Sequence, residues 1–311
     1  MHLKNSRHRP KCGASGVRKD GQQSGRQRYR CATCGHRFQC KKRNERARAV
    51  LWNEYARGKQ TLKELADEYG RSHIWVRKQL DAHEVEEPYD LTPQKTIIVP
   101  DTTFWGRSYG VTVFRSWDLR RNIWWNEVPS EKQAHYLYGR KILEERGWIF
   151  LAAVVDGRRG LATVFKDIPV QVCHFHQMKT VTKYLPSRPK TEAGQELRQI
   201  MLTLPHTTER IFTETLSSWE KKWHDFITEK THITGTKHWY YTHKNVRSAF
   251  MSLKHNLPNL FTYLKYPELN IPNTTNTIDG YFAAVKKKVA AHHGLRKDRR
   301  YKVICELLRK S

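Results

Sequence analysis

The stretch WIFLAAVVDG, at positions 148–157, decides the fold. It is a continuous apolar run ending in Asp156 and Gly157, a pattern typical of a strand buried on both faces of a sheet. Turn-separated β-branched or aromatic runs precede it and predict a three-stranded meander at 96–101, 109–116 and 122–128. The remaining predicted elements are helices over 131–146 and around 159–166 and a strand in IPVQVC at 168–173. Strands first, then alternating helices and strands, predict an α/β domain.

Composition and periodicity extend this prediction to a multidomain α/β chain. The stretch EVEEPYDLTPQK is acidic, poor in apolar residues and rich in proline, so a linker is expected there. The predicted organisation is a basic cysteine-bearing segment at 1–43, a helical DNA-binding domain at 44–88, a linker at 89–95, an α/β core at 96–176, a mostly helical insertion at 177–272, and a final helix with a basic tail at 273–311.

Charge points to a polyanionic partner. The 311 residues include 57 Lys or Arg against 30 Asp or Glu, a net charge of +27, and segment 1–43 has 13 basic residues with Asp20 as its one acid. Such an excess favours nucleic acid through phosphate neutralisation and counterion release. No apolar run approaches the ~20 residues of a membrane span, and MHLKNSRHRP has no signal-peptide core. We therefore expect a cytoplasmic, nucleoid-associated protein without a membrane partner.

Four of the six cysteines lie near the start of the chain, a distribution that suits metal better than a disulfide framework. Cys31 and Cys34 form a CxxC knuckle, which supplies two thiolates to a tetrahedral Zn²⁺ site, and Cys12 adds a third. Arg9 stands where a second knuckle needs cysteine. The fourth ligand is expected to be His8, with His36 and Cys40 as alternatives, and the competing interpretation is a basic arm with incidental cysteines.

Residues 44–88 have the spacing of a helix-turn-helix. Thr61 and Glu64 predict a capping box, and Ser72 is expected to cap a third helix with the sequence HIWVRKQL. The side chains expected to enter a DNA groove are those of Arg71, His73, Arg77 and Lys78. The alternative is a plain helical hairpin that only packs on its neighbours.

Three aspartates carry the predicted chemistry. Asp101 is expected to end the first strand of the α/β domain, Asp156 ends the long apolar strand, and Asp279 begins the final helix. Carboxylates at the ends of adjacent strands and at the start of a facing helix can converge, and such hard oxygen ligands hold Mg²⁺ or Mn²⁺. The alternatives are a strand-ending turn at Asp156 and a helix N-terminal carboxylate at Asp279.

Several stretches together resemble the mutator-type bacterial insertion-sequence transposases, in the variant that has an N-terminal zinc ribbon. The motifs are DTTFWG at 101–106, VVDGRRGL at 154–161, QVCHFHQMK at 171–179 and IPNTTNTIDGYFAAVKKK at 271–288. The resemblance implies a zinc ribbon and helix-turn-helix, followed by a ribonuclease-H-like catalytic domain of the three-carboxylate (DDE/DDD) class. It also implies an all-helical insertion before the last catalytic helix.

The same resemblance implies roles for individual residues. Asp101 and Asp156 match the first two catalytic aspartates, and Asp279 stands where the family generally has glutamate. Cys173 and His176 match a CxxH element with a structural role. Trp239 lies in the insertion, where related enzymes use an aromatic residue to stack on distorted bases; a core tryptophan is the alternative.

The function implied is that of an insertion-sequence transposase active in DNA transposition and recombination. Mg²⁺-dependent cleavage at the element ends would be followed by strand transfer. Its partners would be double-stranded DNA with terminal inverted repeats, target DNA, and further copies of the chain in a synaptic homo-oligomer. The alternative is a catalytically inactive, transposase-derived DNA-binding protein or regulator.

Overall fold

The computed structural model describes Cys12 and residues 16–23, 26–39, 43–58, 60–85, 91–292 and 294–309, with the side chains of 26, 43–46 and 276–279 left out. The chain forms two compact units. The first comprises Met1–Val85 and Lys288–Glu306, and the second comprises Glu86–Lys287 and Leu307–Ser311. Within the described ranges, no helix has both the length and the apolar character needed to cross a membrane.

The first unit begins with a small antiparallel sheet in the order β1-β2-β3. Its strands are β1 (Val17–Gln23), β2 (Arg26–Cys31) and β3 (Arg37–Gln39). Asp20 on β1 forms ion pairs with Arg28 on β2 and Arg37 on β3, at 3.3 and 2.8 Å. The sheet therefore places Cys31 at the end of its central strand, where the following turn leads to Cys34.

Three helices follow: α1 (Arg43–Ala56), α2 (Leu62–Glu68) and α3 (His73–Asp81). The predicted capping box is confirmed, because the Thr61 side chain accepts from the Glu64 backbone while the Glu64 carboxylate accepts from the Thr61 backbone. The side chain of Ser72 caps α3, also as predicted. The hydroxyl of Tyr69 donates to the Glu54 carboxylate at 2.6 Å and so joins α2 to α1.

A segment from the far end of the sequence completes this unit. The sequence predicts one final helix running into a basic tail, but α12 (Asn276–Ala290) ends and a separate helix, α13 (Lys297–Arg309), follows. Arg299 on α13 is only 5% exposed and donates two hydrogen bonds to the Asp81 carboxylate, at 2.9 and 2.6 Å. Contacts between residues so far apart in the chain have no local periodicity, so the sequence pattern does not show them.

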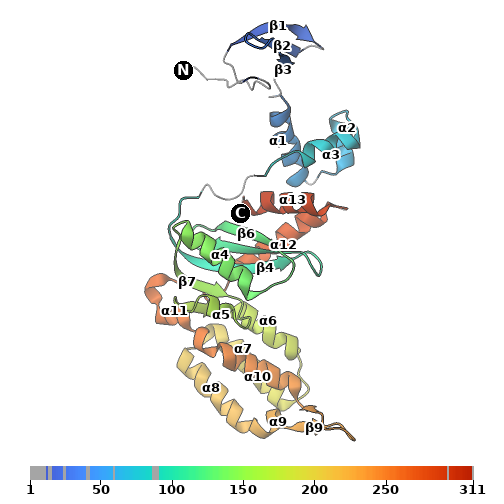
Figure 1. Cartoon of the computed structure of the whole chain (residues 1–311). Coiled ribbons are helices and arrows are strands. Elements are labelled where there is room, and N and C mark those ends of the chain that lie inside the picture. The colour runs from blue at the N-terminus through green and yellow to red at the C-terminus, as the bar shows by residue number, and fades with distance from the viewer. Residues whose placement is uncertain are drawn as a thin grey trace. The chain divides into compact units, whose positions relative to one another are not determined.

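The second unit is built on a mixed five-stranded sheet in the order β6-β5-β4-β7-β8 (Figure 1). The predicted meander is confirmed: β4, β5 and β6 pair antiparallel, whereas β7 pairs parallel with β4 and with β8. The bounds are β4 (Lys95–Phe104), β5 (Gly110–Ser116), β6 (Arg121–Val128), α4 (Gln133–Glu145), β7 (Ile149–Val155), α5 (Leu161–Val164) and β8 (Val170–Val172).

The core of this unit confirms that the apolar run at 148–157 forms a buried strand. Ala152, Ala153 and Val154 have no exposed surface. Helix α4 packs tightly on the sheet at Gly139, where an added Cβ would lie 2.5 Å from Trp124 and 2.7 Å from Phe114. This close packing fixes the position of α4 relative to the strands.

The region predicted to be an all-helical insertion also contains strands. Two three-residue strands, β9 (Lys230–His232) and β10 (Trp239–Tyr241), form an antiparallel hairpin, so the all-helical prediction is wrong. Gly235 supplies a left-handed residue in the connection, at φ 78°, and the β-forming run WYY favours the strand. The helices are α6 (His174–Tyr184), α7 (Glu192–Thr203), η1 (Leu204–His206), α8 (Glu209–Lys222), α9 (His224–Thr228), α10 (Lys244–Asn256), η2 (Leu257–Asn259), α11 (Thr262–Lys265) and η3 (Pro267–Leu269).

Candidate functional site

Asp101 and Asp156 follow the same paired position of two neighbouring strands. In the parallel pair of β4 and β7, Ile98 lies opposite Ala153, and these two residues stand three positions before Asp101 and Asp156. Asp101 does not end its strand, as the sequence suggested, because β4 stays paired with β5 as far as Phe104. It lies instead within β4, three residues beyond the last residue that β4 pairs with β7, whereas Asp156 directly follows the end of β7.

Local hydrogen bonds orient both aspartates. The Oδ1 atom of Asp101 accepts from the backbone N–H of Thr102 at 2.7 Å, and that of Asp156 accepts from the backbone N–H of Arg158 at 2.9 Å. The second contact is an Asx turn, and Gly157 within it has φ 77°. A Cβ at Gly157 would lie 2.8 Å from the Asn256 side chain, so the turn requires glycine for space as well as for conformation.

A chain of polar contacts connects β4, which contains Asp101, with the turn that contains Asp156. It runs through Glu131, a residue that no sequence pattern indicates. The hydroxyl of Tyr136 lies 2.7 Å from the Thr102 hydroxyl and donates to Glu131 Oε1 at 2.6 Å. The other oxygen of Glu131 forms an ion pair with Arg158, the residue whose backbone N–H binds Asp156. Glu131 immediately precedes α4, and only the packing of that helix on the sheet reveals its neighbours.

Burial determines the protonation of this polar chain. Burial raises the pKa of Glu131. The contacts of Glu131 with Tyr136 and Arg158 lower this pKa, and the negative charge of Asp156 raises it. Burial also raises the pKa of Tyr136, and the nearby Glu131 and Asp101 carboxylates raise it further. Tyr136 therefore stays neutral and keeps its proton for the hydrogen bond to Glu131.

The donor chemistry of Asp101 and Asp156 suits a hard divalent cation such as Mg²⁺, because both side chains offer carboxylate oxygens. Among the described residues, however, three potential ligand atoms within 4.8 Å of one another occur only in the cysteine cluster. Asp279 lies in α12, and its side chain is outside the described residues. The structure therefore places the backbone of Asp279 on α12, and the position of its carboxylate stays a prediction.

Cys173 ties the loop before α12 to the end of β7. Its backbone N–H donates to Val155 O at 2.8 Å, next to Asp156. Its Sγ atom accepts from the backbone N–H and the hydroxyl of Thr275, at 3.3 and 3.2 Å. Asp279 follows Thr275 by about one helical turn. The CxxH cysteine is therefore placed to hold the start of α12 beside the strand that leads to Asp156.

The Cys173 thiol has an altered acidity. Burial by itself raises its pKa, but hydrogen bonds from His176 and Thr275 outweigh that effect and lower the pKa to about 7. Cys173 is fully buried, so it is poorly placed to attack a substrate. This environment supports a structural role for Cys173 and His176.

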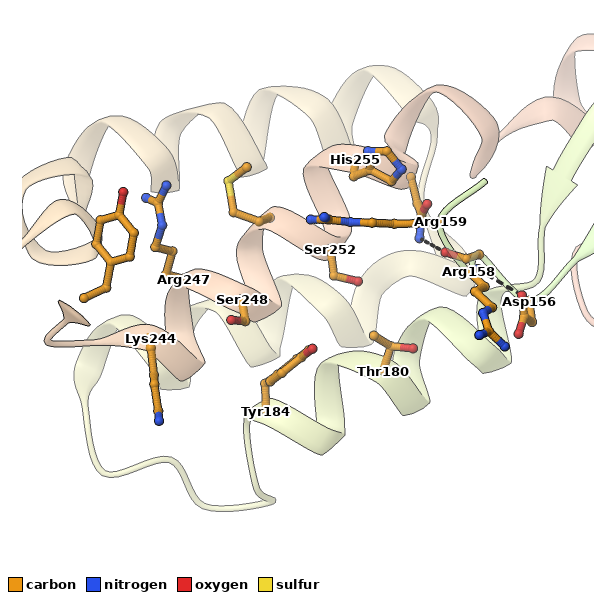
Figure 2. Close-up of a pocket in the computed structure, with 14 residues that line it drawn as sticks. Asp156, Arg158, Arg159, Thr180, Tyr184, Lys244, Arg247, Ser248, Ser252 and His255 are labelled. Carbon is orange, nitrogen blue, oxygen red and sulfur yellow. Dashed lines mark hydrogen bonds between the residues drawn. The ribbon is translucent and has the colours of Figure 1, made fainter. Parts of the chain in front are cut away.

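A groove of about 670 Å³ opens beside the Asp156 turn. Asp156 and Arg158 lie at one end of it and Lys244 and Arg247 at the other, with α6 and α10 between them (Figure 2). The spacing of the α10 lining residues, from Lys244 to His255, shows that one face of this helix borders the groove.

The cysteine cluster lies in the first unit. The ligand atoms of Cys12, Cys31 and Cys34 all lie within 4.8 Å of one another. Hydrogen bonds from the backbone of Cys34 and Thr33, and the contact with Cys12, lower the pKa of Cys31 to about 6. A thiolate at neutral pH within a group of three sulfurs fits Zn²⁺.

The fourth zinc ligand is not shown. His36 is not part of the cluster of close ligand atoms; its ring stacks on Phe38 with centroids 6.3 Å apart. His8 and Cys40 lie outside the described residues. The role of His8 as the fourth zinc ligand therefore stays a prediction.

The predicted basic face around α3 is exposed to solvent. Val76 and Leu80 on α3 are buried, whereas the side chains predicted to contact DNA are all exposed, namely those of Arg71, His73, Arg77 and Lys78. Ile74 on α3 is 57% exposed and adds an apolar group to this surface.

Trp239 lies on strand β10 and is 44% exposed, so the core alternative for this residue is wrong. Its ring packs edge-on against Tyr241 at 5.2 Å, and the Lys230 ammonium lies 4.0 Å from its centroid. The hairpin thus presents an aromatic surface flanked by positive charge.

Comparison of the chain with protein-family models and with curated proteins finds no match. Among solved structures it is similar to a chain described as the Drosophila P element transposase strand transfer complex. That alignment covers 90% of this chain and 94% of the other, with 10% sequence identity and a TM-score of 0.39.

Proposed function

We propose that this chain is a DNA transposase that cuts the ends of an insertion sequence and joins them to target DNA with the help of Mg²⁺ or Mn²⁺. The observation that supports this proposal is the parallel register of β4 and β7, which pairs Ile98 with Ala153, three residues before Asp101 and Asp156. A mixed sheet with an antiparallel meander and two parallel strands supports a ribonuclease-H-like core. This core is the one that the resemblance to mutator-type transposases implies.

The residues proposed to hold the cation are Asp101, Asp156 and Asp279. When bound, a divalent cation in such a site activates the attacking oxygen and stabilises the leaving one. The Asx turn orients Asp156 through one carboxylate oxygen, and the backbone N–H of Thr102 orients Asp101 through one carboxylate oxygen. The polar chain through Glu131 links Thr102, next to Asp101 on β4, with Arg158 in the turn that contains Asp156.

Recognition of the element ends is proposed for the first unit. Arg71, His73, Arg77 and Lys78 supply phosphate and base contacts, and Ile74 supplies an apolar contact suited to a thymine methyl group. The cysteine cluster, with zinc bound, would order the basic segment in front of these helices. Two element ends and a target require at least two copies of the chain, so the working assembly is proposed to be a homo-oligomer.

The second candidate is a transposase-derived DNA-binding protein without catalysis. Asp279 favours it, because the related transposases generally have glutamate at that position. The shorter side chain withdraws the third carboxylate by one methylene. The two candidates make the same prediction for DNA binding and opposite predictions for cleavage.

The test is metal-dependent nicking of a DNA fragment that carries the inverted repeats flanking the gene. We expect Asp101→Asn and Asp156→Asn each to reduce nicking by about a thousandfold or more, because an amide loses the charge that holds the cation. DNA binding should change little. Asp225→Asn on α9 is the matched control, since Asp225 is exposed and lies outside the site.

Wild-type protein that binds the fragment but never nicks it with Mg²⁺ or Mn²⁺ would favour the regulator. Wild-type nicking rates in both aspartate variants would overturn the proposed site.

A further inference from the structure

We infer that the groove beside Asp156 holds a single strand of nucleic acid, which runs from the aspartates toward the hairpin of β9 and β10. This inference rests on the proposed function and extends it, because it specifies a surface in the second unit for one strand of the substrate. The groove is bordered by the turn after β7, by α6 and by α10 (Figure 2).

The floor of the groove is held by hydrogen bonds between buried side chains. Gln177 on α6 has no exposed surface; its amide nitrogen donates to Ser252 Oγ on α10 at 3.0 Å, and its oxygen accepts from Asn256 Nδ2 at 2.7 Å. Asn256 also donates to Gly157 O at 3.2 Å. The floor is therefore attached directly to the turn that contains Asp156, and a strand lying on it is held in register with that carboxylate.

The charge of the groove suits phosphate. Asp156 is the only carboxylate that lines it among the described residues, against four basic side chains. Arg159 and Lys244 are exposed and form no ion pair within the described part of the chain. Arg247 lies over the Tyr241 ring at 4.0 Å, which leaves its positive charge beside an aromatic face. Of the four basic side chains, Arg158 is paired with Glu131. Positive charge along a groove together with aromatic rings is the combination by which proteins hold single strands.

The dimensions favour one strand over a duplex. Helices α6 and α10 are joined by hydrogen bonds, and the axes of two packed helices lie ~8–10 Å apart. The α10 face from Lys244 to His255 is ~16 Å long. That length matches about five phosphates at the spacing of a duplex strand, and fewer when the strand is extended. The volume is within the range that encloses a ligand of nucleotide size.

The test uses full-length protein without divalent metal, so that cleavage plays no part. The probe is a single-stranded DNA of about twelve nucleotides, within the site size of known single-strand grooves, containing 5-iododeoxyuridine. Light couples this base to aromatic side chains that it contacts. We expect crosslinks at Tyr184 and Tyr241, both of which line the groove, and weaker crosslinking from the same label in a duplex.

The variants are Arg159→Glu combined with Lys244→Glu, with Lys221→Glu, an exposed lysine on α8, as the matched control. The double variant should lose the Tyr184 and Tyr241 crosslinks. The slope of log binding constant against log salt concentration should also become shallower by about 1.4, because two phosphate contacts are removed. The control should behave as wild type.

Crosslinks confined to tyrosines outside the groove, or crosslinks to Tyr184 and Tyr241 that persist in the double variant, would overturn the inference. A duplex that crosslinks at these two tyrosines as strongly as the single strand would overturn it as well. Absence of nicking together with crosslinks at Tyr184 and Tyr241 would count against the proposed function while supporting the groove.

Discussion

The two candidate metal sites of this chain are assembled in opposite ways. Cys31 and Cys34 are brought together by one turn after a short strand, and their ligand atoms, with that of Cys12, already lie within 4.8 Å of one another. Asp101 and Asp156 come from separate strands, and their proximity depends on the register of the whole sheet. A local site can thus be recognised from spacing alone, whereas a site built on a sheet depends on every contact that sets its register.

This difference also predicts how the sites respond to change. The cysteine cluster belongs to the first unit and the aspartates to the second. Loss of one cysteine removes a ligand that no other described residue near the cluster replaces. Loss of a contact around the aspartates should instead have a graded effect, because the sheet, the Asx turn and the polar chain through Glu131 each contribute to their placement.

The largest expected effect in this comparison is that of Cys31→Ser. A hydroxyl binds Zn²⁺ far more weakly than a thiolate, and the lowered pKa of Cys31 favours the thiolate form that binds the metal. We expect metal analysis of the purified protein to show about one zinc ion per wild-type chain and none in the variant. DNA binding by the full chain should weaken at the same time.

The matched variant for this experiment is Asp156→Asn, which should keep its zinc and lose nicking. Zinc loss in Asp156→Asn would show that the two sites are not independent. If wild-type protein contains no zinc and Cys31→Ser does not affect DNA binding, the zinc site is contradicted. Segment 1–43 would then be a basic arm with incidental cysteines.

A smaller effect is expected for Glu131→Gln, which keeps the shape of the side chain and the hydrogen bond from Tyr136 but removes the charge that pairs with Arg158. Nicking should fall by about tenfold, the cost of losing one charged contact that orients the Asp156 turn. Glu145→Gln, at an exposed position on α4, is the control.

A change in pH separates this role from general destabilisation. Because the pKa of Glu131 is raised in the folded state, the folded protein binds the proton more tightly than the unfolded chain. Wild-type unfolding free energy should therefore fall, relative to Glu131→Gln, as pH rises from the ordinary glutamate pKa toward the raised one. Parallel urea-unfolding curves for the two proteins across that range would contradict the assignment.

The sequence indicated the features that depend on local pattern. The buried strand at 148–157, the capping box of Thr61 and the CxxC knuckle were all predicted, and the structure contains each of them. The sequence pattern does not indicate Glu131, because its partners are Tyr136 on α4 and Arg158 in the turn after β7. The docking of Arg299 on Asp81 was missed for the same reason.

The hairpin that contains Trp239 was missed for a different reason. Its strands are three residues long, too short for an alternating pattern to stand out from the helical periods around them. The sequence pattern therefore places the aromatic residues of β10 in the predicted helical insertion at 177–272. The run WYY favours a strand, but the strand is established by its pairing with β9, in which Trp239 lies opposite His232.

The smallest expected effect concerns Cys173, which links the strand before Asp156 to the loop before α12. The pKa of its thiol is lowered from 9 to about 7 in the folded protein, so between these values the unfolded chain binds the proton and the folded chain does not. Stability rises with pH wherever the unfolded state binds more protons. The contribution of Cys173 should thus be absent below about pH 7 and grow as pH rises toward 9.

Cys173→Ala removes this dependence together with the contacts to Thr275. The difference in unfolding free energy between wild type and Cys173→Ala, measured by urea denaturation, should widen from pH 7 to pH 9. Cys305→Ala removes another buried cysteine, one on α13, and serves as the control for loss of volume. A difference that stays constant over this range would mean that Cys173 acts through packing alone and that its thiolate contributes nothing to holding α12. Reduced nicking in Cys173→Ala at pH 9, with the pH-dependent difference present, would connect the anchor of α12 to the placement of Asp279.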